Sequence, residues 1–221
     1  PTVRGGSGRS RCDGIPVVGR MLSALKGVPL PSSVEDLPWL IDPPGTATLF
    51  PQSEEEMVAR DALLLMDPGA IILVADEKNL GRSLALLLHA AQFQLPMVVV
   101  LNMADEARLQ GVTVDTDLLS EELGVDFIRT VALEGRGVAG LTRALLKPRL
   151  PTASVTFPEA MESALQQLEA LLAGTRIAPR ALALQLLGGD ETAARLVKAE
   201  LGAQVLADAR AVVDSLAAGS A

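Results

Sequence analysis

Short hydrophobic runs alternate with helical stripes through the middle of the chain. Two apolar runs, residues 71–74 and 98–101, are rich in β-branched side chains and predict strands buried on both faces. Apolar residues at helical spacing over 80–91 predict a helix between them. Further strands are expected at residues 37–41 and 127–132. Because strand and helix alternate across this region, the pattern predicts an α/β fold with a mostly parallel sheet and flanking helices.

The pattern changes after residue 147. Residues 148–155 contain two prolines and predict a linker, whereas residues 156–221 carry helical stripes and no strand candidate. We therefore expect a small all-helical domain to follow an α/β domain of residues 14–147. Residues 1–13 are rich in Gly, Ser and Arg without periodicity, which predicts a flexible N-terminus.

Capping residues mark the start of three predicted helices. Ser53 with Glu56, and Thr156 with Glu159, have the spacing of a capping box, in which a hydroxyl and a carboxylate satisfy backbone N–H groups of the first turn. Asp190 follows two glycines and precedes another helical segment, so it is expected to be an N-cap.

The amino-acid composition argues against several kinds of binding site. The net charge of −8 and the aromatic content of 2% argue against a nucleic-acid partner, which requires basic surface and stacking side chains. No apolar stretch approaches the roughly 20 residues of a membrane span. The single cysteine and the single histidine, His89, leave too few ligands for a zinc site. We expect His89 to be a structural side chain.

Asn102-Met103-Ala104-Asp105 follows the apolar run 98–101 directly. A buried parallel strand delivers the residues after it to the carboxyl edge of the sheet, where open α/β folds bind ligands. An amide and a carboxylate there can bind one planar group, because the carboxylate accepts from two donors such as the N1 and N2 groups of guanine. Asn and Asp are also common in turns, so a simple turn is the alternative interpretation.

Two earlier segments have the form of phosphate and metal motifs. Gly14 to Gly19, followed by Arg20 and Met21, has the glycine spacing of a phosphate-binding loop, but Arg and Met replace the usual Lys and Ser/Thr. Asp42-Pro-Pro-Gly45 could hold Mg²⁺ through water with Asp42 and meet a γ-phosphate with the Gly45 N–H. The alternatives are a glycine turn and a proline-rich turn.

The order of these motifs resembles the ferrous iron transport protein B family. The likeness spans roughly residues 14–215 and is strongest over 42–147. Residues 42–49 and 53–61 resemble that family's Asp-Leu-Pro-Gly-Thr-Tyr-Ser-Leu and Ser-x-Glu-Glu-x-Val-Ala-Arg-Asp segments. Residues 95–107 are similar to its guanine-reading segment. Thr130-Val131-Ala132 resembles its Thr-Ser-Ala base-contact loop, with Val131 in place of serine, and residues 182–190 resemble part of its helical domain.

The resemblance implies a P-loop GTPase-like domain and a helical domain in the cytoplasm, at the inner face of the plasma membrane through a transmembrane iron-transport region outside this chain. GTP or GDP is the implied cofactor, and that membrane region or another protein the implied partner. The implied phosphate-binding residues are Gly14, Gly19, Arg20 and Gly45, with Asp42 on Mg²⁺ through water. The implied guanine-binding residues are Asn102, Met103, Asp105, Thr130, Val131 and Ala132.

The departures from the family lie on the phosphate side. Arg20 replaces lysine, and the thioether of Met21 is a poor ligand for Mg²⁺, which prefers oxygen. The main hypothesis is therefore a regulatory domain that binds guanine nucleotide with impaired or absent hydrolysis and little affinity for Mg²⁺. Two alternatives stay open: an active GTPase, and a nucleotide-free pseudo-GTPase that serves as a protein-binding scaffold.

Overall fold

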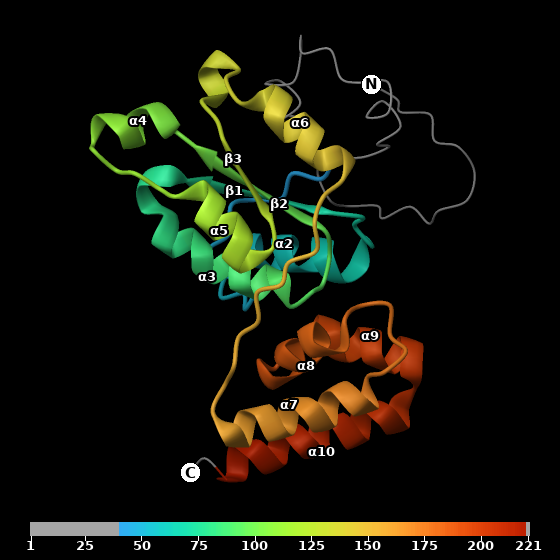
Figure 1. Ribbon diagram of the computed structural model, residues 1–221. Helices are drawn as coiled ribbons and strands as arrows, with labels where there is room; N and C mark the ends of the chain where they lie inside the picture. The colour runs from blue at the N-terminus through green and yellow to red at the C-terminus, as the bar shows by residue number, and fades with distance from the viewer. Residues whose placement is uncertain (1–39, 220–221) are drawn as a thin grey trace, which may run out of the picture.

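A parallel sheet forms the centre of the first domain (Figure 1). The computed structural model describes residues 40–219, and in this part of the chain the sheet has three strands in the order β1-β2-β3. Strand β2 (Met97–Asn102) pairs in parallel with β1 (Ile71–Asp76) on one side and with β3 (Asp126–Arg129) on the other. The predicted parallel sheet with flanking helices is confirmed.

Alternate residues of β2 face two different hydrophobic cores. Val98 and Val100 pack with Leu141 of α6 (Val138–Leu146) on one face. Val99 and Leu101 belong to the larger core on the other face. That core is covered by helices from several parts of the chain, namely α2 (Glu54–Leu65), α3 (Leu80–Ala91) and α5 (Thr116–Leu123). The central strand is buried on both faces, as its unbroken apolar run predicts.

Three strand predictions need correction. Val74 of β1 is 51% exposed, because β1 is the edge strand of the described sheet and one of its faces is only partly covered. Strand β3 ends at Arg129, so Thr130 to Ala132 form a loop and the short helix η2 (Ala132–Glu134) instead of extending the strand. Leu40 and Ile41 have no strand structure, and the rest of the segment 37–41 lies outside the described residues.

Two of the three predicted helix starts are confirmed. Ser53 Oγ accepts from Glu56 N at 3.3 Å at the start of α2, and Asp190 Oδ1 accepts from Ala193 N at 2.7 Å at the start of the next-to-last helix. The predicted box at Thr156 is wrong. The helix starts at Glu159, after Pro158, and has no side-chain cap.

The second domain consists of helices only in the part of the chain described. It comprises α7 (Glu159–Leu171), α8 (Pro179–Leu187), α9 (Glu191–Leu201) and α10 (Ala203–Gly219), and α10 lies along α7 (Figure 1). No helix within residues 40–219 is long and apolar enough to cross a membrane.

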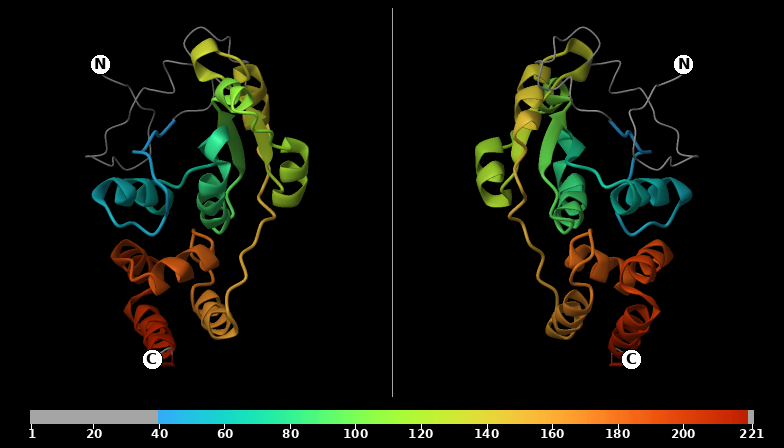
Figure 2. Two further views of the ribbon diagram at one scale, coloured as in Figure 1. Left: turned by 90° about the vertical axis from the view of Figure 1, so that its left-hand side faces the viewer. Right: turned by 90° about the vertical axis from the view of Figure 1, so that its right-hand side faces the viewer.

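The helical domain packs against the side of the sheet domain that carries α2 and α3 (Figure 2). The guanidinium of Arg60 in α2 forms an ion pair with Asp190, and both side chains are buried. Gln185 of α8 donates from Nε2 to the carbonyl oxygen of Leu49 at 3.1 Å, and Arg176 donates to the carbonyl oxygen of Leu64. The larger hydrophobic core continues through this contact, so the two domains share buried surface.

Candidate functional site

The carboxyl edge of the sheet brings together residues that are far apart in the sequence. The side-chain oxygen of Asn102, at the end of β2, accepts hydrogen bonds from Thr130 Oγ1 at 3.0 Å and from the Ala132 backbone N–H at 3.1 Å. The backbone N–H of Ala104 donates to the carbonyl of Thr130 at 3.2 Å. The sheet edge therefore unites Asn102 with the loop 130–132, and Val131 within that loop is buried.

Met103 makes the turn that brings Asp105 to the same edge. It is the single residue between β2 and α4 (Ala104–Leu109), and it adopts the left-handed conformation with φ 61° and ψ 34°. A residue other than glycine in this conformation is strained, and such strain is common at functional sites. The tight turn places the half-buried Asp105 in the first turn of α4, where the helix dipole favours a carboxylate.

Polar groups at this edge remain available to a ligand. The oxygen of Asn102 is used within the protein, but its Nδ2 donor has no hydrogen-bond partner among residues 40–219. The carboxylate of Asp105 likewise accepts no hydrogen bond from the described residues. Because the Asn102 oxygen is held on two sides, the position of the free Nδ2 is fixed by the fold.

Lys78 is a charged neighbour that the sequence analysis did not identify. It follows β1 in the 3-10 helix η1 (Glu77–Asn79). Its Nζ lies 3.7 Å from the Met103 sulfur and forms an ion pair with Glu106. The hydrogen bond that Lys78 donates to the Glu106 carboxylate raises the pKa of Lys78, so the ammonium stays charged near neutral pH. The position of Lys78 just after a predicted strand could have indicated it, because β1 and β2 are adjacent parallel strands whose ends meet at one edge of the sheet.

A second ion pair connects the ends of β1 and β3. The carboxylate of Glu77 is buried, and one of its oxygens accepts from Arg129 Nε at 2.8 Å. The same guanidinium donates to the carbonyl of Val114, so the segment before α5 is held as well. This pair fixes the end of β3, from which the loop of Thr130 begins. Sequence reasoning missed it, because 52 positions separate the two residues.

The predicted phosphate and metal residues are only partly within the described chain. Asp42 is half-buried and Gly45 is exposed, both in the irregular segment before α2. The structure connects neither residue to Asn102 by a hydrogen bond, and within residues 40–219 no cluster of His, Cys, Asp and Glu could hold a metal ion. The predictions for Gly14, Gly19 and Arg20 lie outside the described residues. The structure thus brings together the predicted base-binding residues and leaves the phosphate-binding set a prediction.

Comparison with known proteins agrees with this division into two domains. Residues 33–145 match the family model for "Ferrous iron transport protein B", and residues 157–219 match the model for "FeoB cytosolic helical domain". The Fe(2+) transport protein A/Fe(2+) transporter FeoB fusion protein of Porphyromonas gingivalis is 34% identical over 171 residues, which cover 72% of this chain. The Fe(2+) transporter FeoB of Salmonella typhimurium is 37% identical over 110 residues, 48% of this chain.

These relatives are much longer than the present sequence, which spans 20% and 14% of their respective lengths. Solved structures have the same fold. The apo cytosolic domain of the T. maritima FeoB iron transporter has a TM-score of 0.64 and 30% identity, covering 80% of this chain and 77% of that one. NFeoB from S. thermophilus bound to GDP.AlF4- and K+ has a TM-score of 0.66 and 28% identity, covering 79% and 70%.

The likeness therefore holds at three levels: the ordered motifs of the sequence, the parallel sheet followed by a helical bundle, and the superposition on known cytosolic domains. The chain belongs to the ferrous iron transport protein B family, in which it corresponds to the cytosolic G domain together with the helical domain that follows it.

Proposed function

We propose that the carboxyl edge of the sheet binds the guanine base of GTP or GDP. The observation that carries this proposal is the pair of hydrogen bonds that hold the Asn102 oxygen and leave its Nδ2 donor free. The N7 and O6 atoms of guanine are acceptors that such a donor can satisfy. The Asp105 carboxylate would accept from N1–H and from the exocyclic amino group, two donors that adenine lacks in that arrangement.

The roles proposed for Met103 and for the loop 130–132 follow from their positions next to Asn102. Met103 would lie beside the base, and the loop of Thr130, Val131 and Ala132 would flank it, since this loop is bonded to Asn102. One FeoB structure similar to this chain is bound to GDP, and another is a GMPPNP form. This supports a guanine nucleotide as the ligand of the present chain.

The phosphate side is proposed from the sequence. Gly14, Gly19 and Gly45 would offer backbone N–H groups to the phosphates, Arg20 would supply positive charge, and Asp42 would hold Mg²⁺ through water. Phosphoryl transfer depends almost entirely on positioning and charge at the phosphates. With Arg and Met in the lysine and Mg²⁺-ligand positions, we infer that hydrolysis is impaired or absent.

The proposed role in the whole protein is regulatory. The relatives are Fe(2+) transporters, and this chain spans a small fraction of their length. We infer that residues 14–147 form a G domain in the cytoplasm, joined by residues 148–155 to the helical domain of residues 156–221. Both would act on a membrane-embedded iron-transport region, or on a partner protein at the inner membrane face.

Calorimetric titration of the whole chain with GDP, GTP and ADP tests the base-binding proposal. We expect the guanine nucleotides to bind and ADP to bind at least about tenfold more weakly, because each lost hydrogen bond to a charged group costs about 1.5–3 kcal/mol. Equal affinity for GDP and ADP would overturn the proposal. Failure of every nucleotide to bind the folded chain would favour the scaffold alternative.

A variant that places a hydrogen-bond donor where Asp105 has an acceptor is a sharper test of base recognition. Asp105→Asn should weaken GDP binding by about ten- to a hundredfold on the same estimate and improve binding of xanthosine diphosphate, whose C2 oxygen can accept from the new amide. Loss of GDP binding without any gain for the xanthine nucleotide would place Asp105 away from the base.

A measurement of GTP hydrolysis tests the alternative of an active GTPase. Phosphate release from GTP that is abolished by Asp42→Asn would favour that alternative.

A further inference from the structure

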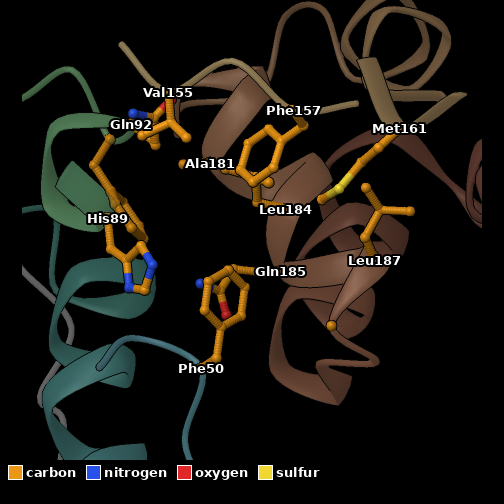
Figure 3. A pocket seen from close by; sticks show the side chains of 12 residues that line it. Phe50, His89, Gln92, Val155, Phe157, Met161, Ala181, Leu184, Gln185 and Leu187 are labelled. Carbon is orange, nitrogen blue, oxygen red and sulfur yellow. The ribbon is translucent and has the colours of Figure 1, made fainter. Parts of the chain in front are cut away.

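The two faces of the sheet have different surroundings. The helical domain packs on the face that carries α2 and α3, and a pocket of about 230 Å³ lies there between the two domains (Figure 3). Helix α6 covers the opposite face, with the helical domain on the far side of the sheet (Figure 1). Only one side of α6 is buried, through Val138, Leu141 and Thr142. Its outer side therefore faces away from the rest of the described protein.

The segment that contains α6 has a local excess of positive charge. Residues 135–158 include Arg136, Arg143, Lys147 and Arg149 and no Asp or Glu. The whole sequence, in contrast, has 27 acidic residues and a net charge of −8. All four basic side chains are exposed. Because the chain as a whole repels anionic surfaces, attraction to such a surface has to come from a local basic patch of this kind.

Three exposed side chains share the outer side of α6. Arg143, Leu146 and Lys147 are spaced by three and four residues, which places them next to one another on a helix. Leu146 is 45% exposed although it is apolar. Arg149 and Leu150 follow just beyond the helix and are also exposed, Leu150 by 54%. We call Arg143, Leu146 and Lys147 the α6 face.

The charges of the α6 face are not neutralised by the described residues. Neither Arg143 nor Lys147 forms an ion pair with them, and the Arg143 guanidinium donates only to the Ala139 carbonyl at 3.3 Å. Arg149 lies 3.5 Å from Asp126, but both side chains are partly exposed, and such pairs are worth little in water. The α6 face and its neighbour Arg149 can therefore interact with an external anion.

We propose that the α6 face binds the surface of an anionic lipid bilayer. Lys and Arg side chains are attracted to acidic headgroups, and an exposed leucine beside them can enter the boundary between headgroups and acyl chains. An acidic peptide would satisfy the charges of Arg143 and Lys147 but would give Leu146 no apolar surroundings. The combination of basic and apolar side chains on one exposed face therefore favours a bilayer.

This contact leaves the candidate base-binding edge accessible. The carbonyl of Arg149 accepts from the backbone N–H of Met97, the first residue of β2. The chain just after α6 is thus at the amino edge of the sheet, whereas Asn102 is at the carboxyl edge. Lipid binding and guanine binding use separate surfaces, so each can be tested without the other.

Sedimentation of the whole chain with lipid vesicles tests the proposal. The probes are vesicles of phosphatidylcholine alone and vesicles of three parts phosphatidylcholine to one part phosphatidylglycerol. We expect at least about tenfold stronger binding to the anionic vesicles. Raising NaCl from about 0.1 M to about 1 M should abolish the difference, because the Debye length falls from about 10 Å to about 3 Å. Equal binding to both vesicles, or no binding by the folded chain, would overturn the proposal.

A double variant locates the contact on the molecule. Arg143→Gln with Lys147→Gln should lower binding to the anionic vesicles by about 25-fold, since each basic side chain near such a surface contributes about fivefold. Arg195→Gln with Lys198→Gln is the matched control, because it removes the same charge from exposed positions of α9. It should leave binding unchanged, and both variants should keep the wild-type melting transition. Equal losses in the two variants would overturn the assignment to α6.

Leu146→Ser tests the apolar part of the contact. Serine cannot enter the acyl boundary favourably, so binding to the anionic vesicles should weaken while its dependence on NaCl stays the same. The substitution is at an exposed position, so the fold should be retained. Unchanged affinity would overturn the role of the leucine, and would leave the basic side chains without the feature that favours a bilayer over an acidic peptide.

Discussion

Asn102 is the residue on which the candidate site depends most directly. Its oxygen is the acceptor for two donors of the loop 130–132, so one side chain both closes the loop and orients the free amide donor. The sequence predicts this residue from its place at the end of a buried strand. The sequence does not reveal that its oxygen is engaged within the protein.

Replacing Asn102 with alanine should destabilise the fold as well as weaken guanine binding. Thr130 is buried, so removing its acceptor together with that of the Ala132 N–H should lower the free energy of unfolding by about 1–3 kcal/mol. Urea denaturation measures this loss. Thr130→Val is the control, because it removes one of the two hydrogen bonds and should cost less. A larger loss for Thr130→Val than for Asn102→Ala would contradict the shared-acceptor arrangement.

His89 should titrate below the ordinary histidine range. Burial lowers its pKa, because the low-polarity surroundings disfavour the imidazolium. Below the ordinary pKa of about 6.5 the unfolded chain binds a proton that the folded chain binds less readily, so stability should fall as the pH drops through this range. Since the sequence has a single histidine, proton NMR of its ring follows the titration directly.

The expected NMR midpoint lies below 6.5. Comparing the pH dependence of urea unfolding with that of His89→Phe separates this group from the carboxylates, because the variant lacks only the histidine proton. The wild-type chain should lose stability relative to the variant as the pH falls below the ordinary pKa. A midpoint at or above the ordinary value would show that the imidazole is solvated.

At the scale of elements, helix starts depend on both local sequence and contacts. The capping box at Ser53 forms because the Glu56 carboxylate accepts a hydrogen bond from the backbone N–H of Gln52 at 2.9 Å. The segment at Thr156 has the same residue pattern, but Pro158 occupies the N-cap position, and Glu162 accepts from the Phe157 N–H at 2.9 Å. A matching pattern is therefore not sufficient where a competing acceptor is available one turn later.

Asp190 joins the start of α9 to α2, so its removal should be costly. It caps the Ala193 N–H and pairs with Arg60, which is 3% exposed. Breaking a buried pair leaves an uncompensated charge and costs about 3–5 kcal/mol. Because Asp61 also contacts Arg60 at 2.8 Å, we expect Asp190→Ala to reach the lower end of that range in urea denaturation.

Two comparisons separate the cap from the ion pair. Asp190→Asn keeps an oxygen for the helix start but removes the charge, so most of the loss should remain. Asp115→Ala removes an exposed cap of α5 that has no ion pair with any described residue, and should cost about 1 kcal/mol. If all three variants lose the same amount, the Arg60 contact contributes nothing.

At the scale of the whole molecule, Arg180 connects the helical domain with the linker and the sheet domain. It donates to Glu162 at 2.7 Å and Glu169 at 2.8 Å in α7, to the carbonyl of Val155 at 2.9 Å, and to Gln92, the C-cap of α3, at 3.2 Å. The hydrogen bond to Glu162 raises the pKa of Arg180, and the same bond lowers the pKa of that carboxyl. This one guanidinium thus holds the end of the linker at Val155, whereas the backbone of Arg149 is held by the Met97 N–H.

Arg180→Ala should release the linker for cleavage. Thermolysin can cut before Val155, whose carbonyl oxygen accepts from Arg180, and loss of hydrogen bonds to charged groups should accelerate cutting there by about tenfold, equivalent to 1.4 kcal/mol. Timed digestion with mass spectrometry measures the rate at this bond. Arg143→Ala is the control, because among residues 40–219 that exposed side chain bonds only to the Ala139 carbonyl of its own helix. Equal rates for the two variants would contradict the role of Arg180.

The sequence by itself determined the parallel sheet, the all-helical second domain and the place of Asn102 and Asp105 at the carboxyl edge of the sheet, where we propose that guanine binds. These follow from hydrophobic periodicity, strand ends and motif order, which are local properties of the chain. Only the tertiary structure decided the Glu77–Arg129 and Arg60–Asp190 pairs, the approach of Lys78 to Met103, and the pocket between the domains. Each joins residues from separate elements, and burial or pairing at such a place depends on how those elements pack.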